Sequence, residues 1–276
     1  MTLIIMALVS WLSFQSVAPD QLSCTPSGGD PGQLGIVLLH AKSTFSVSGH
    51  GRMPAYDATI APLASALRAA GFRVAVPEMP WSRDHVYDRT FAQALDEIAG
   101  AAAKLRAEGA QRIVVGGHSM GGMAAIGYAA LKGGVAGVVA IAPAHDPASS
   151  VFKQRLGASV ASARDMAAAG KGDVQATFGD YNMGQVGEIT ATAADYLSFF
   201  DPAGDVPMPR NTARFPGPIP LLWIVAADDP LSRLGPDYAF AKAPPDPLSR
   251  YITISGGHVN APAEAATIVV NWLKCL

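Results

Sequence analysis

The sequence is short of cysteine and of charge, and each shortage argues against a class of protein or site. Only 15% of its 276 residues are charged, and 20 basic side chains nearly balance 22 acidic ones. Nucleic acids are bound by strongly basic surfaces, so no nucleic-acid partner is expected. The two cysteines, Cys24 and Cys275, stand near opposite ends of the chain without C-x-x-C spacing, which gives no support to a zinc site. They predict instead a disulfide that joins the termini, the alternative being two free thiols.

Charge is also missing from the first 18 residues. Residues 3–9 are strongly apolar, and Ser16-Val17-Ala18 has the small-x-small pattern of a signal-peptidase site, although no Lys or Arg precedes the apolar run. This segment predicts a secretory signal peptide over residues 1–18 and export to the periplasm or medium. A membrane anchor or a buried helix fits less well, because polar residues interrupt the run before the ~18 apolar residues of a span accumulate. No stable membrane span is therefore expected after processing.

Residues 19–276 contain no repeat and no low-complexity linker, which favours one domain. Short apolar runs predict strands over residues 35–39, 73–77, 112–115, 135–141, 220–225 and 250–254. Segments with helical spacing of apolar residues alternate with them, for example over residues 91–105. Alternation of this kind predicts an α/β fold with a doubly wound, mainly parallel six-stranded sheet.

Residues 144–218 break this alternation, because no convincing strand is evident between the fourth and fifth predicted strands. A structureless loop of that length is unusual in a compact domain. Residues 157–169 are rich in alanine, and Tyr196, Phe199 and Phe200 form an aromatic group. The segment is predicted to be a small helical insert, or cap, over the sheet.

The strongest chemical signal is Gly117-His118-Ser119-Met120-Gly121, which follows a predicted strand and opens a predicted helix. That context is what the G-x-S-x-G nucleophile elbow requires, since only glycine fits two positions before and after the serine. An ordinary glycine-rich turn and a phosphate loop are the alternatives. A dinucleotide loop would need G-x-G-x-x-G and an acid about twenty residues later, and neither is present in that form.

Four segments together resemble the landmark motifs of the α/β-hydrolase superfamily, in the same order. They are residues 38–40 (LLH), 116–122 (GGHSMGG), 224–230 (IVAADDP) and 256–258 (GGH). The resemblance extends over about residues 34–274. It implies a sheet of the α/β-hydrolase type with a cap, and a serine hydrolase with Ser119 as nucleophile.

A serine hydroxyl needs a base, and this fold orders its triad as serine, acid, histidine. Only His145 and His258 follow Ser119, and only His258 lies after the last predicted strands, so His258 is the predicted base. The acid should follow the fifth strand. Asp229, directly before a proline, is the predicted acid, and Asp228 is the main alternative. More distant alternatives are Asp201 and Asp205.

A tetrahedral intermediate needs two N–H groups aimed at its oxyanion. Met120, directly after the nucleophile, is expected to supply one. The family usually shows His-Gly-x after the first strand, whereas this chain has His40-Ala41-Lys42. Lys42 is the predicted second donor and Ala41 the alternative. The Lys42 side chain is expected to be solvated, or else to steer an anionic group.

Three other histidines, His40, His118 and His145, are predicted to contact substrate, and for His40 the alternative is support of the loop after the first strand. The expected function is hydrolysis of an ester, or a related acyl bond, of a small-molecule or lipid-like substrate through an acyl-enzyme. No metal or organic cofactor is implied. The alternatives are a C–C bond hydrolase on the same triad and a non-catalytic binding protein of this fold.

Overall fold

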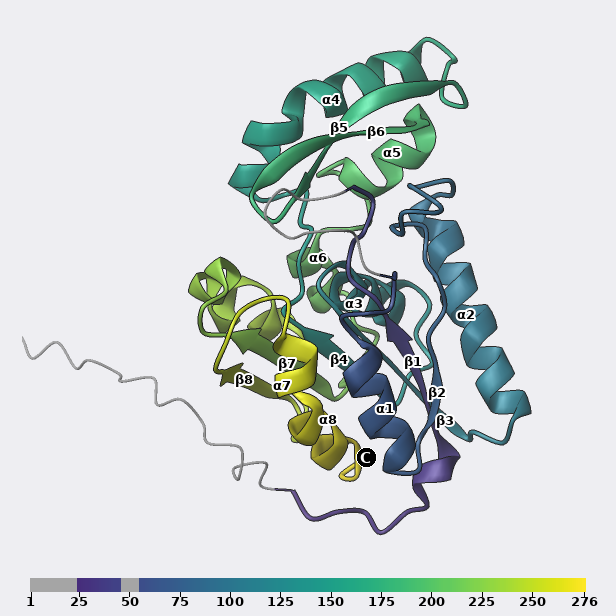
Figure 1. The fold of residues 1–276 in the computed structure, drawn as a ribbon, viewed down its shortest axis with the longest axis vertical. Coiled ribbons are helices and arrows are strands. Elements are labelled where there is room, and N and C mark those ends of the chain that lie inside the picture. The colour runs from purple at the N-terminus through teal and green to yellow at the C-terminus, as the bar shows by residue number, and fades with distance from the viewer. Residues whose placement is uncertain (1–23, 46–54) are drawn as a thin grey trace, which may run out of the picture.

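The computed structural model describes residues 24–45 and 55–276, so the predicted signal peptide lies outside the described residues. Its main sheet has six parallel strands in the order β2-β1-β3-β4-β7-β8 (Figure 1). The strands are β1 (Leu34–Leu39), β2 (Arg73–Ala75), β3 (Arg112–His118), β4 (Gly137–Ile141), β7 (Leu221–Ala226) and β8 (Arg250–Ile254). This sheet confirms the predicted fold class. The chain order reverses between β1 and β3, where open α/β sheets bind ligands.

Helices cover both faces of the sheet. They are α1 (Ala61–Ala69), α2 (Phe91–Ala107), α3 (Met120–Leu131), α7 (Ala261–Glu264) and α8 (Ala266–Leu273). Short 3-10 turns occupy Pro31–Gln33, Pro230–Leu234, Pro236–Tyr238 and Phe240–Lys242. Alternate residues of a strand face opposite sides, so Ile36 and Leu38 pack with α1 and α8, whereas Val37 and Leu39 pack with α2 and α3. No helix in the described part of the chain is long and apolar enough to span a bilayer.

The insert between β4 and β7 differs from the prediction, because it is not purely helical. It contains α4 (Ser150–Ala168), β5 (Gln175–Asn182), β6 (Gln185–Thr192), α5 (Ala193–Phe200) and α6 (Met208–Ala213), and β5 pairs with β6 as an antiparallel hairpin. Inward positions of the hairpin carry Phe178 and Ile189 but also Asp180 and Gly187, so the two-residue apolar period is weak. That weak pattern explains why the hairpin was not predicted.

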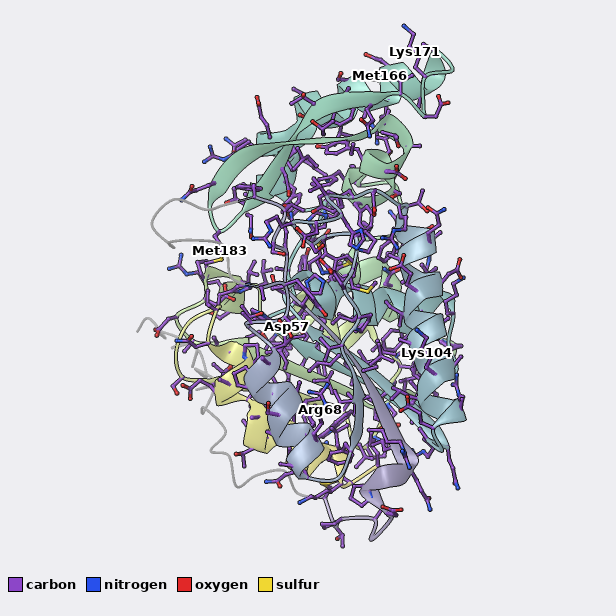
Figure 2. The ribbon with its side chains drawn as sticks, turned by 45° about the vertical axis from the view of Figure 1, so that its right-hand side comes forward. Asp57, Arg68, Lys104, Met166, Lys171 and Met183 are labelled. Carbon is purple, nitrogen blue, oxygen red and sulfur yellow. A yellow bond between two sulfur atoms is a disulfide. The ribbon has the colours of Figure 1, made fainter. Side chains whose placement is uncertain are left out.

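The part of the insert from α4 to α5 stands above the carboxyl ends of β1 and β3, whereas α6 lies beside α3 (Figure 1). Tyr196 stacks between Phe178 and Phe200, which packs β5 against α5. The tip of the hairpin at Met183 lies at the end of the insert nearer the sheet, and Lys171 lies at the far end (Figure 2). The buried apolar residues of the insert are continuous with the core on the α2 and α3 side of the sheet, where Phe199 packs against Phe91.

The two ends of the described chain meet beside the sheet. Cys24 and Cys275 form a disulfide with a Cα–Cα separation of 5.9 Å. Beside this bond, the Ser27 amide donates to the Lys274 carbonyl at 2.9 Å. The disulfide closes a loop with a sequence separation of 251 residues. The neighbouring Leu276 carbonyl accepts from Arg112 at the amino end of β3, whereas Ser119 follows the carboxyl end of that strand.

Reduction of this disulfide should lower the melting temperature while leaving activity unchanged at moderate temperature. By chain-entropy reasoning the bond stabilises the folded state by about 4–5 kcal/mol at most, and measured values for long loops fall short of that. Thermal melts with and without reductant, beside activity assays on the same samples, would measure both effects. An intact mass that shows two alkylatable thiols in the non-reduced protein would contradict the disulfide.

Candidate active site

The turn from β3 into α3 holds Ser119 in a strained backbone conformation. Its φ is 56°, in the left-handed region that non-glycine residues rarely adopt, and its amide donates to the Ile141 carbonyl at 2.9 Å. A Cβ at Gly117 would lie 2.6 Å from the Gly121 backbone, and one at Gly121 would lie 2.4 Å from the Leu39 carbonyl oxygen. Backbone atoms cannot give way as a side chain can. Both glycines are therefore required by close approach.

His258 and Asp229 come to Ser119 from loops at the same edge of the sheet. His258, in the loop after β8, places Nε2 2.9 Å from Ser119 Oγ. Its Nδ1 lies 2.5 Å from Oδ2 of Asp229, which follows β7. The other Asp229 oxygen accepts the Leu231 amide at 2.9 Å, so both carboxylate oxygens are engaged and the side chain is fixed.

The protonation of this chain of groups follows from Asp229. Burial pushes its pKa upward, but the hydrogen bond and charge of His258 outweigh that effect and lower the pKa below its usual value. An ionised carboxylate can only accept, so His258 Nδ1 carries the proton. In the neutral imidazole, His258 Nε2 is then the acceptor, and the Ser119 hydroxyl donates to it. This direction is the one that proton removal from serine requires.

The structure separates the candidate acids. Asp229 is 4% exposed and touches His258, whereas its neighbour Asp228 is exposed. Asp201 pairs with Arg164 on the insert, and Asp205 pairs with Arg214. Of the predicted acids, Asp229 is thus the one brought to His258.

The backbone after β1 lies directly over the first turn of α3. The Leu39 and His40 carbonyl oxygens are 2.4 and 2.7 Å from where a Gly121 Cβ would stand. The Met120 amide is the first of α3 and has no partner within its own helix. Residues 41 and 42 follow in this loop, so the predicted donors of an oxyanion site come from adjoining segments.

His40 orients the Ala41–Lys42 peptide. Its Nε2 accepts the Met79 amide at 2.9 Å, so the proton is on Nδ1, which donates to the Ala41 carbonyl at 2.7 Å. No cis peptide occurs among the described residues, so the Lys42 N–H points away from the Ala41 carbonyl and from the His40 ring. Lys42 as the second donor, with Ala41 as the alternative, stays a prediction. Both His40 ring nitrogens are engaged and the residue is fully buried, contrary to the expected substrate contact.

His118 is also used by the protein itself, and not by a substrate as expected. It is 1% exposed, and its Nε2–H donates to the His258 carbonyl at 2.8 Å. Its ring lies against that of His258, with centroids 4.9 Å apart. His118 therefore connects the elbow to the loop that carries the predicted base.

His145 lies near the nucleophile but faces the insert. The amide of the preceding residue, Ala144, donates to the Ser119 carbonyl at 3.1 Å. The His145 ring packs edge-on against Phe152 and Phe200, and Nε2–H donates to the Phe199 carbonyl at 3.1 Å. Its Nδ1 is buried without a hydrogen-bond partner in the structure. Contact of His145 with substrate stays a prediction.

The Lys42 side chain is not solvated, which corrects the expectation for it. It is 4% exposed, and Nζ lies 2.5 Å from Oδ1 of Asp180, on β5 of the insert. Burial lowers the pKa of Lys42, and the Asp180 carboxylate partly offsets this effect. Sequence reasoning missed Asp180, since no motif or spacing connects two residues 138 positions apart.

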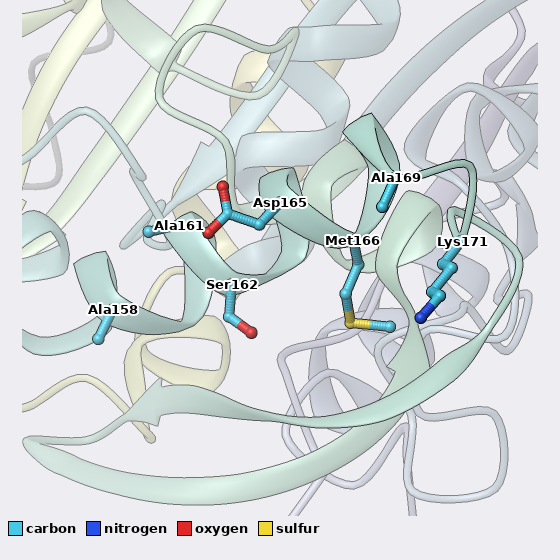
Figure 3. A pocket seen from close by; sticks show the side chains of 7 residues that line it. All are labelled: Ala158, Ala161, Ser162, Asp165, Met166, Ala169 and Lys171. Atoms are coloured by element: carbon cyan, nitrogen blue, oxygen red, sulfur yellow. The ribbon is translucent and has the colours of Figure 1, made fainter.

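An open hollow runs along α4, lined by Ala158, Ala161, Ser162, Asp165, Met166, Ala169 and Lys171 (Figure 3). None of the predicted site residues lines it. Within the described residues, no group of three or more His, Cys, Asp or Glu side chains is arranged to hold a metal ion. The Ser119–His258–Asp229 series is therefore the arrangement with a recognisable chemical capability, that of a nucleophile with its base and an orienting acid.

The chain thus combines an open, parallel α/β sheet with a hydrogen-bonded series of Ser119, His258 and Asp229. The sequence model of the Alpha/beta hydrolase family matches residues 36–271, and the chain belongs to that family. No curated protein matches the sequence.

Solved structures with esterase or lipase names share the fold. A monoacylglycerol lipase from Paleococcus ferrophilus has a TM-score of 0.59 at 20% identity, covering 89% of this chain and 96% of its own. Est1E from Butyrivibrio proteoclasticus, solved with ferulic acid, has a TM-score of 0.52 at 14% identity, covering 91% and 90%. A carboxyl esterase from Bacillus coagulans also has a TM-score of 0.52 at 14% identity, covering 81% of each chain. Likeness at these identities concerns the fold alone.

Folding stability should fall as the pH drops from about 6.5 towards 4. Burial lowers the pKa of His40 to about 4 and, together with the nearby His258 charge, that of His118 to about 3. Over this window the unfolded chain takes up protons that the folded chain excludes, so the free energy of unfolding decreases with falling pH. Each histidine contributes a slope of up to about 1.4 kcal/mol per pH unit.

The His118→Gln variant isolates one of these contributions, because its side-chain amide N–H, at the position of the imidazole Nε2, can still donate to the His258 carbonyl but does not titrate. Urea unfolding at pH 5 to 6.5 should show a shallower pH dependence for this variant than for the wild type. Equal slopes would contradict the assignment of a neutral, buried His118.

Proposed function

We propose that the protein is a serine hydrolase that cleaves esters through an acyl-enzyme intermediate. The observation that carries the proposal is the hydrogen-bonded series of Ser119 Oγ, His258 Nε2, His258 Nδ1 and Asp229 Oδ2, with separations of 2.9 and 2.5 Å. The proton direction derived for that series is the one that activates the hydroxyl. The strained elbow supports the proposal further, since it presents Ser119 at the carboxyl edge of the sheet.

In the acylation step, Ser119 Oγ attacks the ester carbonyl carbon while His258 Nε2 takes its proton. Asp229 stabilises the imidazolium that results. The carbonyl oxygen becomes an oxyanion, which the amides of Met120 and Lys42 bind. His258 then gives its proton to the leaving alcohol as the tetrahedral intermediate collapses to the acyl-enzyme.

Deacylation repeats the same steps with water. His258 removes a proton from a water molecule, whose oxygen attacks the acyl carbon, and the proton passes to Ser119 Oγ as the acid leaves. Every proton in the cycle moves through His258 Nε2, so no further acid or base is needed.

The proposed substrate is a small-molecule or lipid-like ester, with carboxylesterase as the leading class. The esterase and lipase names of the structural neighbours support this class. At 14% and 20% sequence identity, the likeness itself shows a shared fold and no more. A panel of p-nitrophenyl esters of increasing acyl length would define the acyl preference.

Export is proposed as well. The apolar, uncharged segment at residues 1–18 supports it, and so does the disulfide between Cys24 and Cys275, because structural disulfides persist in oxidising compartments. Fractionation of the native host with an antibody against the protein tests it. Detection in the cytoplasm alone would contradict export.

A fluorophosphonate probe should label the wild-type protein covalently, and Ser119→Ala should abolish labelling. Ser119→Ala and His258→Ala should each lower kcat for the best p-nitrophenyl ester by four or more orders of magnitude, roughly as in other triads. The double variant should lose no more than either single one, because both changes disable the same proton transfer. A folded wild type that is neither labelled nor active would favour a binding protein instead.

Asp229→Asn should lower kcat far more than Asp228→Asn, by as much as about 10⁴-fold, because an amide cannot fix the His258 tautomer that accepts from serine. Asp228→Asn is the matched control, since it makes the same chemical change at the adjacent, exposed position. Side-by-side kinetics decide between them. The reverse order of losses would move the acid role to Asp228.

A further inference from the structure

The insert places a carboxylate directly beside the loop that follows β1. Asp180, on β5, is completely buried. One carboxylate oxygen accepts a hydrogen bond from Lys42 Nζ at 2.5 Å, and the other accepts one from the Thr44 hydroxyl at 2.7 Å. A third contact joins the same two segments, because the Phe45 ring fills the space where a Gly187 Cβ would stand. The insert thus holds this loop at residues 42, 44 and 45.

The ammonium group of Lys42 is also held by several contacts. Its Nζ also donates to the Tyr181 carbonyl at 3.1 Å, and it lies over the rings of Tyr87 and Phe200 at 5.9 and 5.4 Å. Removing two charges from water costs several kcal/mol per ion, so a buried pair is seldom a gain in stability over an apolar pair. We therefore look for the role of the Lys42–Asp180 pair in the position at which it holds Lys42.

Fixing the Lys42 side chain also fixes the Lys42 backbone. The other flank of the loop is held by the main domain, where the Trp81 Nε1–H donates to the His40 carbonyl and the Ser43 amide donates to the Trp81 carbonyl, both at 2.9 Å. The Ala41–Lys42 peptide lies between these anchors and the insert. Its N–H group is the proposed oxyanion donor of Lys42.

We propose that Asp180 is a positioning residue for the oxyanion site, acting through its ion pair with Lys42. This inference rests on the proposed serine-hydrolase function. The insert would then do more than cover the site, since it completes the loop that binds the transition state. Tyr87 extends the same cluster towards the other donor, because its hydroxyl lies 3.5 Å from Asp180 Oδ2 and 3.7 Å from the Met120 sulfur.

The test compares Asp180→Asn with the wild type against a pair of inhibitors of similar shape, of which only one forms a covalent adduct that carries an oxyanion. A trifluoromethyl ketone that carries the preferred acyl chain adds Ser119 and forms an oxyanion, whereas the corresponding trifluoromethyl carbinol cannot. Loss of one oxyanion donor costs about 10²–10³-fold in kcat, so a displaced donor should cost roughly 10–100-fold. Asp180→Asn should lower kcat by that factor and raise the Ki of the ketone by the same factor. KM and the Ki of the carbinol should stay within about threefold of the wild-type values.

The matched control is Asp201→Asn, which breaks the exposed Arg164–Asp201 pair of the insert. It should change the affinity for neither inhibitor. A second variant, Lys42→Met with Asp180→Leu, removes the ion pair without leaving a charge buried. It should melt somewhat below the wild-type temperature, because the Thr44 hydroxyl and the Tyr181 amide lose their acceptor, and it should bind the ketone at least about tenfold more weakly.

The outcomes separate the two proposals. Equal weakening of ketone and carbinol by Asp180→Asn, or no weakening, overturns the positioning role, and so does wild-type ketone affinity in the double variant. If Asp180→Asn does not fold, the double variant decides alone. Failure of the wild type to react with a fluorophosphonate overturns the proposed function itself, and that result is read before any variant is made.

Discussion

The site depends on one close backbone contact, that of the β1 loop with the first turn of α3. The Leu39 carbonyl lies 2.4 Å from where a side chain at Gly121 would begin, and Gly117 is as tightly confined. Only a turn without side chains at these two positions lets the loop and the helix meet. The strained Ser119 conformation and the pairing of the two proposed amide donors both follow from this contact.

Around that contact, buried histidines act as fixed connectors. His40 carries its proton on Nδ1 because a backbone amide occupies Nε2, and His118 ties the elbow to the His258 loop. Burial keeps both neutral at physiological pH, which a connector with one donor and one acceptor requires. Of the histidines in the described part of the chain, His258 is the one that hydrogen-bonds to Ser119.

The insert shows how a segment without a strong sequence pattern still takes a defined place. Its hairpin uses inward positions for a charge and a glycine, and both are matched by the β1 loop, Asp180 by Lys42 and Gly187 by Phe45. The hairpin is therefore specified by its partner as much as by its own residues. This arrangement makes the geometry of the proposed oxyanion site a property shared by the main domain and the insert.

The sequence alone determined the parallel sheet, the elbow and the choice of Ser119, Asp229 and His258 as candidates, because buried strands and tight turns leave local patterns that can be read. It also predicted the disulfide that joins Cys24 and Cys275. Only the tertiary structure decided which aspartate meets His258, and that His40 and His118 support loops. It likewise revealed the hairpin and the Lys42–Asp180 pair. These features are contacts between residues far apart in the chain, and no local period or spacing encodes them.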